Sequence, residues 1–387
     1  MVEGDTSMKI LVLGAGLMAQ GAVFDYLQND DVSAITVADN SPDALARIQK
    51  RFPDDRLRAE TFDARDDRQI EELMKDVDGV FGAVHYGFNL AFSRAAIATG
   101  THMVDLGGNN DVVASQMALS EDAEKAGVTI TPDCGLAPGM VAVLVKWGIE
   151  RFRWVDTVRI RVGGLPRHPK PPFHYERLFS IEGLINEYVE APIRLENGRI
   201  VTAEPLGDLE TLTFAEPAGT LEAFNTSGGV STMPESFGDR LNNLDYKTLR
   251  YPGHAHAMHW LYHLGLFSSQ PVTVGDATVV PRQLTASAIR DHVPEGEDDM
   301  TVVRVEFAGP DGEQHRVHRL DIIDTYNAEQ QLTSMMRMTA FPAAIVSQMQ
   351  CDGRITARGV VPQERCVEGN TFVEELVKRG IAITGLE

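Results

Sequence analysis

Residues 9–39 combine, in order, an apolar run, a glycine turn, a helix-forming stretch, a second apolar run and an acid. The first run, Ile10 to Leu13, predicts a buried parallel strand, and the turn Gly14-x-Gly16-x-x-Ala19 follows it directly. Glycines at this point allow a sharp bend and let a pyrophosphate approach bare backbone, while the following helix points free N–H groups at the phosphates. The order predicts a dinucleotide-binding crossover, although the glycine motif alone also occurs in ordinary turns.

Asp39 ends the second apolar run and lies about 20 residues beyond the glycines. A carboxylate there accepts hydrogen bonds from both hydroxyls of an adenosine ribose, and it repels a 2′-phosphate unless an arginine lies nearby. Residues 40–46 contain no arginine, and Arg47 comes only further along the next expected helix. We therefore predict NAD, rather than NADP, as the cofactor.

The first third of the chain continues as alternating strands and helices, which is typical of a doubly wound parallel sheet. The spacing predicts strands at 77–84, 102–106 and 128–131, and helices at 89–99 and 115–126. Ligands of such sheets lie outside the carboxyl ends of the strands. That rule nominates three short segments: His85-Tyr86-Gly87, Leu106-Gly107-Gly108-Asn109 and Asp133-Cys134-Gly135.

From Trp154 onward the pattern changes to longer strands with hairpin signals. We expect a strand at 155–163, two strands joined by an Asn197-Gly198 turn at 192–203, and a hairpin at 299–323 closed by Gly309-Pro310-Asp311-Gly312. Helices are expected at 253–264, 331–349 and 371–378, and a last strand at 380–383. The predicted fold is therefore α/β, with a Rossmann doubly wound parallel sheet and an inserted α+β domain on a largely antiparallel sheet. The expected parts are a dinucleotide domain at 1–140, a substrate and dimerisation domain at 141–345, and a C-terminal segment at 346–387 that returns to the first domain.

The charge balance restricts the partners of this chain. Lys and Arg total 35 against 56 Asp and Glu, which gives a net charge of −21. Such a surface repels nucleic acid and anionic membranes, and either a saline habitat or ordinary solubility explains it. The acidic N-terminus lacks an apolar signal core, and no run of about 18 apolar residues occurs, so we expect neither export nor membrane insertion. Three cysteines without a CxxC pair favour the reducing cytoplasm.

Several polar residues are candidates for chemistry. Arg250 precedes the helix that His254 opens, so Arg250 could bind a substrate carboxylate and His254 could accept a proton from an amine. The alternative is a surface ion pair for Arg250 and a structural role for His254. Asp133 either lines a site or caps a helix in a Gly/Pro hinge. His256, His259 and His263 share a helical face, but no HExxH-type signature accompanies them, so we predict no metal site.

Five motifs carry a family resemblance when taken together. They are the glycine turn, DCGLAPGM at 133–140, VGGLPRHPKPPFHY at 162–175, SIEGLINEYVEAPIRLENGR at 180–199, and TLRYPGH at 248–254. The chain resembles the saccharopine dehydrogenase-like reductases and, among them, most closely the L-lysine 6-dehydrogenases. The resemblance implies a homodimer or larger homo-oligomer, an amino-acid substrate, and NAD-dependent oxidation at the ε-amino carbon of L-lysine or a close diamino acid. The products are ammonia and a semialdehyde that cyclises.

The resemblance also implies roles for individual residues. It implies that Gly14, Gly16, Leu17 and Met18 contact the phosphates, that Asp39 binds the ribose, and that Asp63 contacts the adenine edge. We also predict cofactor contacts at Ala83, His85 and Leu106. From the residues themselves we predict substrate contacts at Arg250, Tyr251, Tyr175 and Tyr86, with His254 or Asp133 as the base. Two other functions remain open: an NADPH-dependent reductase of the saccharopine or carboxynorspermidine type, and an NAD-binding regulator without turnover.

Overall fold

The computed structural model describes residues 7–171, 173–296 and 298–386. Residues 1–6, where we expect no signal core, and Pro172 lie outside the described residues. The chain forms two compact units. The first unit contains Met1–Trp147 and Met336–Gly380, and the second contains Gly148–Met335 and Ile381–Glu387. The chain passes between them three times, within the helices α7 (Met140–Arg151) and α12 (Ser334–Cys351) and again between Gly380 and Ile381.

The first unit is built on a parallel sheet in the order β17-β6-β5-β4-β1-β2-β3. Its strands are β1 (Met8–Leu13), β2 (Val32–Asp39), β3 (Leu57–Thr61), β4 (Gly79–Gly82), β5 (His102–Asp105), β6 (Thr129–Thr131) and β17 (Gly359–Val360). Four of the six residues of β1 are both apolar and fully buried, as expected for a central strand covered on both faces. This order, with β1 in the middle, confirms the predicted doubly wound sheet.

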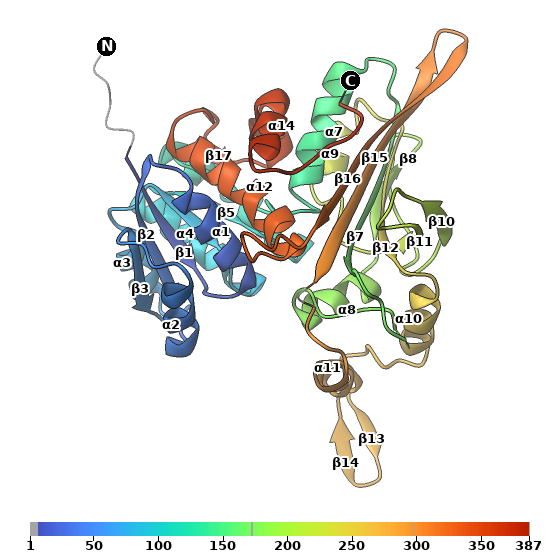
Figure 1. Cartoon of the computed structure of the whole chain (residues 1–387), viewed down its shortest axis with the longest axis horizontal. Coiled ribbons are helices and arrows are strands. Elements are labelled where there is room, and N and C mark those ends of the chain that lie inside the picture. The colour runs from blue at the N-terminus through green and yellow to red at the C-terminus, as the bar shows by residue number, and fades with distance from the viewer. Residues whose placement is uncertain (1–6, 172, 297, 387) are drawn as a thin grey trace. The chain divides into compact units, whose positions relative to one another are not determined.

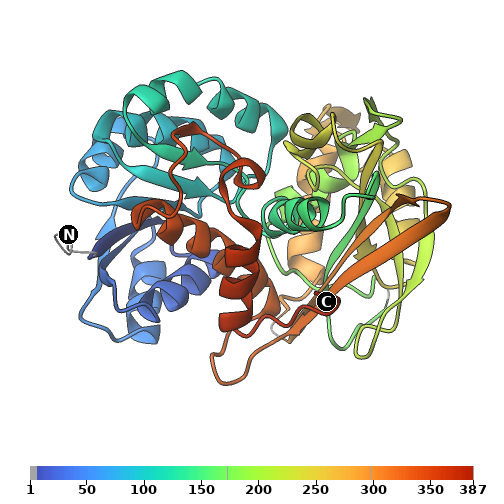
Figure 2. The same ribbon diagram turned by 90° about the horizontal axis from the view of Figure 1, so that it is seen from above.

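Helices cover both faces of this sheet (Figure 2). They are α1 (Leu17–Leu27), α2 (Pro42–Arg51), α3 (Asp67–Met74), the 3-10 turn η1 (Tyr86–Phe88), α4 (Asn89–Thr99), α5 (Asn110–Met117), α6 (Ser120–Lys125), α13 (Gln363–Cys366), α14 (Gly369–Lys378), and the parts of α7 and α12 in this unit. On one face, Ile70, Phe92 and Ala123 from α3, α4 and α6 share a core with strand residues. The other face carries α1 and α12.

Helix α1, which follows the glycine turn, is fixed by the C-terminal helices of the same unit. A Cβ on Gly21 would lie 2.9 Å from the backbone oxygen of Met336, so glycine allows α1 to approach α12 closely (Figure 1). Asp25 accepts hydrogen bonds from Gln348 Nε2 at 2.9 Å and from Arg379 Nε at 2.5 Å. The C-terminal segment therefore supports the helix whose N-terminus forms the expected phosphate site.

The second unit is built on a mixed sheet with a path β10-β11-β12-β7-β15-β16, in which β8 joins β12 and β9 joins β8. Its strands are β7 (Thr157–Pro166), β8 (Ile193–Glu196), β9 (Arg199–Thr202), β10 (Glu210–Thr213), β11 (Thr220–Asn225), β12 (Asn243–Arg250), β15 (Asp299–Asp311) and β16 (Gln314–Thr325). Only the β12–β7 pair among these described strands is parallel. The predicted, largely antiparallel second sheet is confirmed.

Helices pack against one face of the second sheet. They are α8 (Ile181–Val189), α10 (His254–His263) and α11 (Pro281–His292); α9 (Met233–Phe237) precedes β12, and a separate hairpin, β13 (Val272–Val274) and β14 (Ala277–Val279), projects beyond α11 (Figure 1). The core below α8 and α10 contains Ile185, Tyr188, Phe224 and Met258. The opposite face holds the ion pair of Arg161 with Asp245, whose closest atoms lie 3.0 Å apart.

Three local predictions were wrong. The single helix expected at 115–126 is two helices, because Asn109 caps α5 early by accepting a hydrogen bond from Val112 N, and the chain turns again before Ser120. The turn expected at 309–312 lies at 312–313, because β15 and β16 stay paired as far as Asp311 and Gln314. Residues 380–383 form no strand. The segment that follows belongs to the second unit, where the backbones of Thr384 and Asp321 exchange hydrogen bonds.

Candidate active site

The glycine turn of the first unit has the backbone that a bound pyrophosphate requires. Gly14 has φ +104°, and a Cβ there would lie 2.6 Å from the carbonyl oxygen of Ala83, so this position requires glycine. Gly16 precedes α1, and a Cβ built on it meets no described atom within 4 Å. Leu17 is 47% exposed at the start of the helix, and Met18 is half-buried. The space beside Gly16 and the free N–H groups of α1 fit a phosphate group.

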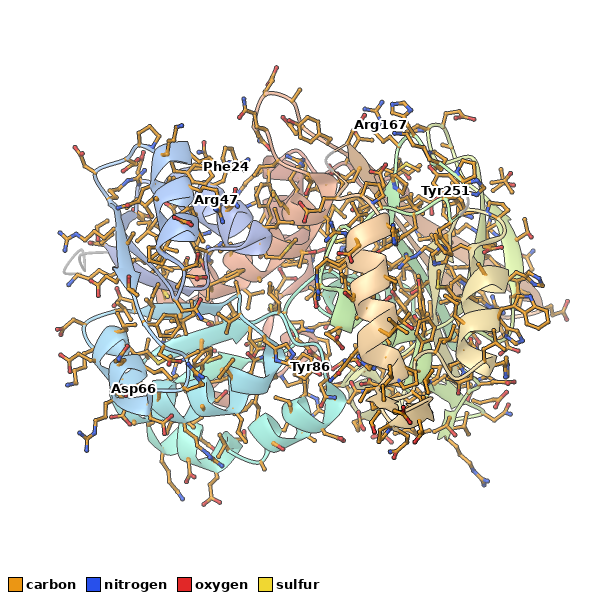
Figure 3. The ribbon with its side chains drawn as sticks, turned by 90° about the horizontal axis from the view of Figure 1, so that it is seen from below. Phe24, Arg47, Asp66, Tyr86, Arg167 and Tyr251 are labelled. Carbon is orange, nitrogen blue, oxygen red and sulfur yellow. The ribbon has the colours of Figure 1, made fainter. Side chains whose placement is uncertain are left out.

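Asp39 lies at the end of β2 beside this turn. Its Oδ2 accepts a hydrogen bond from Ala15 N at 2.7 Å, and its Oδ1 accepts one from Ser41 N at 2.8 Å. The carboxylate therefore fixes the turn, and each oxygen keeps a further lone pair for a ribose hydroxyl. Arg47 is exposed on α2, where Figure 3 labels it.

Asp63 follows β3, and its carboxylate already has a partner. Arg65 Nη2 lies 2.8 Å from Asp63 Oδ2, and this guanidinium lowers the pKa of Asp63 to about 2. Asp63 is thus an ionised acceptor in a surface turn. Its role at the adenine edge stays a prediction.

The segments after β4 and β5 lie against each other. The rings of His85 and Tyr86 are 4.1 Å apart, and His85 Nδ1 accepts a hydrogen bond from Gly87 N. Tyr86, labelled in Figure 3, packs on Gly108, where a Cβ would lie 2.9 Å from the tyrosine ring. The segments His85–Gly87 and Leu106–Asn109, which we nominated because they follow strand ends, therefore lie against each other.

A buried acid connects the second and third of these segments. Asp105 is fully buried at the end of β5 and accepts hydrogen bonds from Gly107 N, Gln116 Nε2 and Asp133 N. Burial raises the pKa of Asp105. Asp133 itself has φ +55°, and a Cβ on Gly107 would lie only 1.4 Å from its Oδ1. Gly107, which follows the half-buried Leu106, thus leaves the space that the Asp133 carboxyl fills.

The second unit contains a separate polar cluster, which we call the Arg250 cluster. Tyr246, Thr248 and Arg250 alternate along β12 and therefore point to the same face of the sheet. The members of the cluster are Arg250, Glu187, Tyr175, Tyr188, Tyr246 and His254. They come from β12, α8, α10 and the loop that precedes α8.

Arg250 is 2% exposed, yet its donors are only partly used. Nη1 donates to the neighbouring Leu249 carbonyl at 2.9 Å, whereas Nε has no hydrogen-bond partner among the described residues. The guanidinium carbon lies 5.2 Å from the centre of the Tyr175 ring, a cation–π contact that orients it. Burial alone would lower the pKa of Arg250, but the neighbouring Tyr188, Tyr175 and Glu187 outweigh it and raise this pKa, so Arg250 is a fixed cation.

Glu187 lies beside Arg250, with 3.6 Å between Glu187 Oε2 and Arg250 Nη2. Loss of hydration raises the pKa of Glu187 to about 7, although the charge of Arg250 opposes this shift. Its Oε2 is buried and accepts no hydrogen bond from any described residue. A carboxyl that titrates near neutral pH beside a fixed cation is the kind of group found at functional sites.

His254 is poorly suited to the predicted role of base. It is 1% exposed, its Nε2 lies 2.9 Å from Tyr188 Oη, and its Nδ1 lies 3.0 Å from the Phe173 carbonyl oxygen. Because a carbonyl only accepts, Nδ1 carries the proton and Nε2 accepts from the tyrosine. Burial and the charge of Arg250 lower the pKa of His254 to about 3. The ring is therefore neutral, with both nitrogens engaged by Tyr188 and Phe173.

The two predicted tyrosines of this unit differ in placement. Tyr175 joins the Arg250 cluster, and its ring centre lies 5.4 Å from that of His254. Tyr251 does not join it, since Tyr251 packs on a different core with Leu249 and donates a hydrogen bond to the Pro166 carbonyl at 2.9 Å. Side chains alternate along an extended chain, so Tyr251 and Arg250 point apart.

The other three histidines of α10 contact neighbours on their own helix. His256 Nε2 accepts a hydrogen bond from Trp260 Nε1, and the rings of His259 and His263 lie 4.2 Å apart. No group of three or more His, Cys, Asp or Glu residues in the described chain is arranged to hold a metal ion. None of the described helices is both long and apolar enough to cross a membrane.

Two family descriptions match adjacent parts of the chain. The saccharopine dehydrogenase NADP binding domain matches residues 10–131, and the saccharopine dehydrogenase C-terminal domain matches residues 135–381. The chain belongs to the saccharopine dehydrogenase family. The resemblance read from the sequence motifs is thus confirmed at the level of the family, and the chain contains a pyridine-nucleotide-binding domain of an oxidoreductase family.

Relatives of the family differ in length from this chain. The mitochondrial alpha-aminoadipic semialdehyde synthase of Bos taurus is 22% identical over 98% of this chain, but the match spans only about half, 48%, of that protein. The saccharopine dehydrogenase [NADP(+), L-glutamate-forming] of Schizosaccharomyces pombe is 21% identical, with 97% of this chain and 98% of that protein covered.

Solved structures share the fold. Apo saccharopine dehydrogenase (L-Glu forming) from Saccharomyces cerevisiae has a TM-score of 0.78 at 20% identity, over 98% of this chain and 99% of that one. The homospermidine synthase of Legionella pneumophila, in complex with NAD, has a TM-score of 0.66 at 10% identity, over 97% and 90% of the two chains. At these identities the likeness shows the fold alone.

Residues that the sequence analysis missed are Glu187, Tyr188, Tyr246 and Asp105. One signal was available for Glu187, which is half-buried and lies between the buried Asn186 and Tyr188 on a short helix. An acid in such surroundings requires a partner. For Tyr246, the alternation with Arg250 along β12 was the available signal.

Proposed function

We propose that this chain catalyses the NAD-dependent oxidative deamination of the ε-amino group of L-lysine or a close diamino acid. Its membership of an oxidoreductase family with lysine-related substrates supports this reaction class. The Arg250 cluster is the observation that carries the proposal, because a buried cation with an unused donor suits the carboxylate of an amino acid.

Separate residues would bind the cofactor and the substrate. The turn at Gly14 and Gly16 would hold the pyrophosphate, and Asp39 would hold the ribose. The bound nicotinamide supplies a hydride acceptor. Arg250 would bind the substrate carboxylate, and Asp133, a buried carboxyl at a strand end, remains our candidate for the group that takes a proton from the ammonium. Loss of hydride from carbon then leaves an imine, and water converts it to aldehyde and ammonia.

The choice of NAD over NADP is part of the proposal. Asp39 sits on the turn itself and repels a 2′-phosphate, and residues 40–46 offer no arginine to offset that repulsion. The family description and the named yeast relative refer to NADP. Both dinucleotides therefore belong in the assay.

A second candidate is the saccharopine dehydrogenase reaction that the relatives' names state. It links an amino acid and an aldehyde through a secondary amine and would use NADP. Its substrate carries more carboxylates than lysine, so it would require cations beyond Arg250.

The test is a screen of lysine, ornithine, diaminopimelate and saccharopine with each dinucleotide, in which absorbance at 340 nm, ammonia and glutamate are measured together. Equal amounts of NADH and ammonia from lysine would support the proposal. NADPH and glutamate from saccharopine would establish the second candidate instead. Tight dinucleotide binding without reduction by any substrate would identify a regulator that does not turn over.

A further inference from the structure

Arg250 and Glu187 each have a buried atom without a hydrogen bond, and these atoms belong to neighbouring side chains. Arg250 Nε and Glu187 Oε2 both lack partners among the described residues. The two side chains nevertheless approach to 3.6 Å, a distance at which the charges attract but no hydrogen bond forms. The Arg250 side chain is 3% exposed and that of Glu187 is 30% exposed, but these two atoms are buried. A purely structural ion pair would normally satisfy both atoms, because an unsatisfied buried polar atom is costly.

The surroundings fix the two groups without neutralising them. Tyr175 lies under the Arg250 guanidinium, and Tyr175, Tyr188 and Tyr246 lie close enough to Glu187 to interact with its charge. The hydroxyls of Tyr188 and Tyr246 are engaged with His254 and Thr248. Burial raises the pKa of each of these tyrosines, so they stay protonated at neutral pH. The neighbouring His254 is neutral.

Glu222, the other acid near this cluster, is already engaged. Its two carboxylate oxygens accept hydrogen bonds from Gly253 N and Ala255 N at the start of α10. Among the described charged groups of this cluster, Arg250 and Glu187 are therefore the two that can still bind a ligand.

We propose that Arg250 and Glu187 together bind the head group of an α-amino acid, with the α-carboxylate on Arg250 and the α-ammonium on Glu187. The α-carboxylate and the α-ammonium of an amino acid are attached to one carbon, so they can meet two adjacent groups of opposite charge. This inference rests on the proposed function, since it assumes that Arg250 binds the substrate carboxylate. It restricts the substrates to α-amino acids and excludes simple amines and diamines.

The site also has a defined dependence on pH. Glu187 binds an ammonium only when it is ionised, and its pKa is about 7. Affinity for the head group is therefore full above neutral pH and falls as the pH decreases below about 7. A site that used Arg250 alone would show no such loss.

Calorimetric titration of the full chain, with NAD or NADP present, tests the inference without turnover. The probe is L-norleucine, which has the head group and side-chain length of lysine but no ε-amine; hexanoate and hexylamine each carry one half of the head group. A hydrogen bond to a charged group contributes about 1.5–3 kcal/mol, so each half should bind at least about tenfold more weakly than norleucine. Equal binding of hexylamine, or no binding of norleucine at millimolar concentration, would overturn the assignment.

Substitutions measure the separate contributions of Glu187 and Arg250 to ligand affinity. Glu187→Gln should weaken norleucine at least about tenfold at pH 8, remove the loss below pH 7, and leave hexanoate unchanged. Arg250→Met should weaken both ligands. The control is Glu182→Gln on the same helix, whose carboxylate pairs with Arg282 instead. If Glu187→Gln fails to fold, the pH dependence of norleucine affinity in the unaltered chain still decides the question. An affinity that stays constant from pH 5.5 to 8.5 would refute the role of Glu187.

The outcomes also distinguish this inference from the proposed function. Norleucine binding that depends on Glu187, without NADH formation from any diamino acid, supports the head-group site and rejects the deamination. Lysine oxidation that is insensitive to Glu187→Gln supports the deamination and rejects the head-group site.

Discussion

Replacing the two glycines of the turn one at a time should separate folding from nucleotide binding. Gly16 has φ −78° and ψ −165°, which alanine adopts without strain, and the added methyl group would meet no described atom within 4 Å. Gly16→Ala should therefore leave the unfolding midpoint almost unchanged. The methyl group would instead occupy the space that the pyrophosphate needs to reach the N–H groups of α1.

The expected loss follows from the hydrogen bond that is blocked. One backbone N–H bond to a charged phosphate contributes about 1.5–3 kcal/mol, and about 1.4 kcal/mol corresponds to a factor of ten. Gly16→Ala should therefore raise the dissociation constant for NADH about 10- to 100-fold, as measured by fluorescence titration. Unchanged affinity in a folded Gly16→Ala protein would show that the pyrophosphate does not lie at this turn.

Gly14→Ala is the matched comparison. Its φ of +104° is unfavourable for any L-residue, and its Cβ would lie 2.6 Å from the Ala83 carbonyl oxygen. Strain of this kind costs about 1–3 kcal/mol, so Gly14→Ala should lower the unfolding midpoint as well as nucleotide affinity. A Gly14→Ala protein as stable as the unaltered chain would contradict the backbone described for the turn.

Three further substitutions test other parts of the first unit. Asp39→Asn removes the charge but keeps one acceptor for the turn. The ratio of NADP affinity to NAD affinity should therefore rise about tenfold relative to an Asp43→Asn control. An unchanged ratio would show that Asp39 does not determine the choice of cofactor. Gly107→Ala should displace the Asp133 carboxyl and lower kcat while NADH binding stays within about twofold; full activity would exclude Asp133 as the base. Asp25→Ala removes the buried carboxylate that accepts hydrogen bonds from Arg379 and Gln348. Because Arg379 keeps its pair with Glu375, the change should cost about 1.5–3 kcal/mol in thermal unfolding, whereas Glu72→Ala, which breaks an exposed pair with Lys75, should cost less than about 1 kcal/mol.

The nucleotide unit was largely predictable because its signals are local. A strand, a glycine turn and a helix are adjacent in the sequence, and the position of Asp39 follows from the length of one crossover. The hydrogen bonds of Asp39 to the turn were not visible, because they depend on two strands lying side by side. Element ends were wrong where a single capping side chain decided them, as Asn109 does for α5.

The Arg250 cluster shows why the substrate side was harder to predict. Arg250 was identified by residue type, but its charged neighbour Glu187 lies 63 positions earlier in the sequence. His254 looked like a base because its type titrates near neutral pH; burial and its contacts with Tyr188 and Phe173 removed that property.

Burial favours the neutral form of both His254 and Glu187. For the histidine this moves the pKa to about 3, away from neutral pH, and for the glutamate it moves the pKa to about 7. The group that titrates near physiological pH is consequently an acid rather than the histidine. A residue's ordinary pKa is therefore a poor guide to which side chain changes charge in a buried cluster, and the pH dependence of ligand binding should follow Glu187.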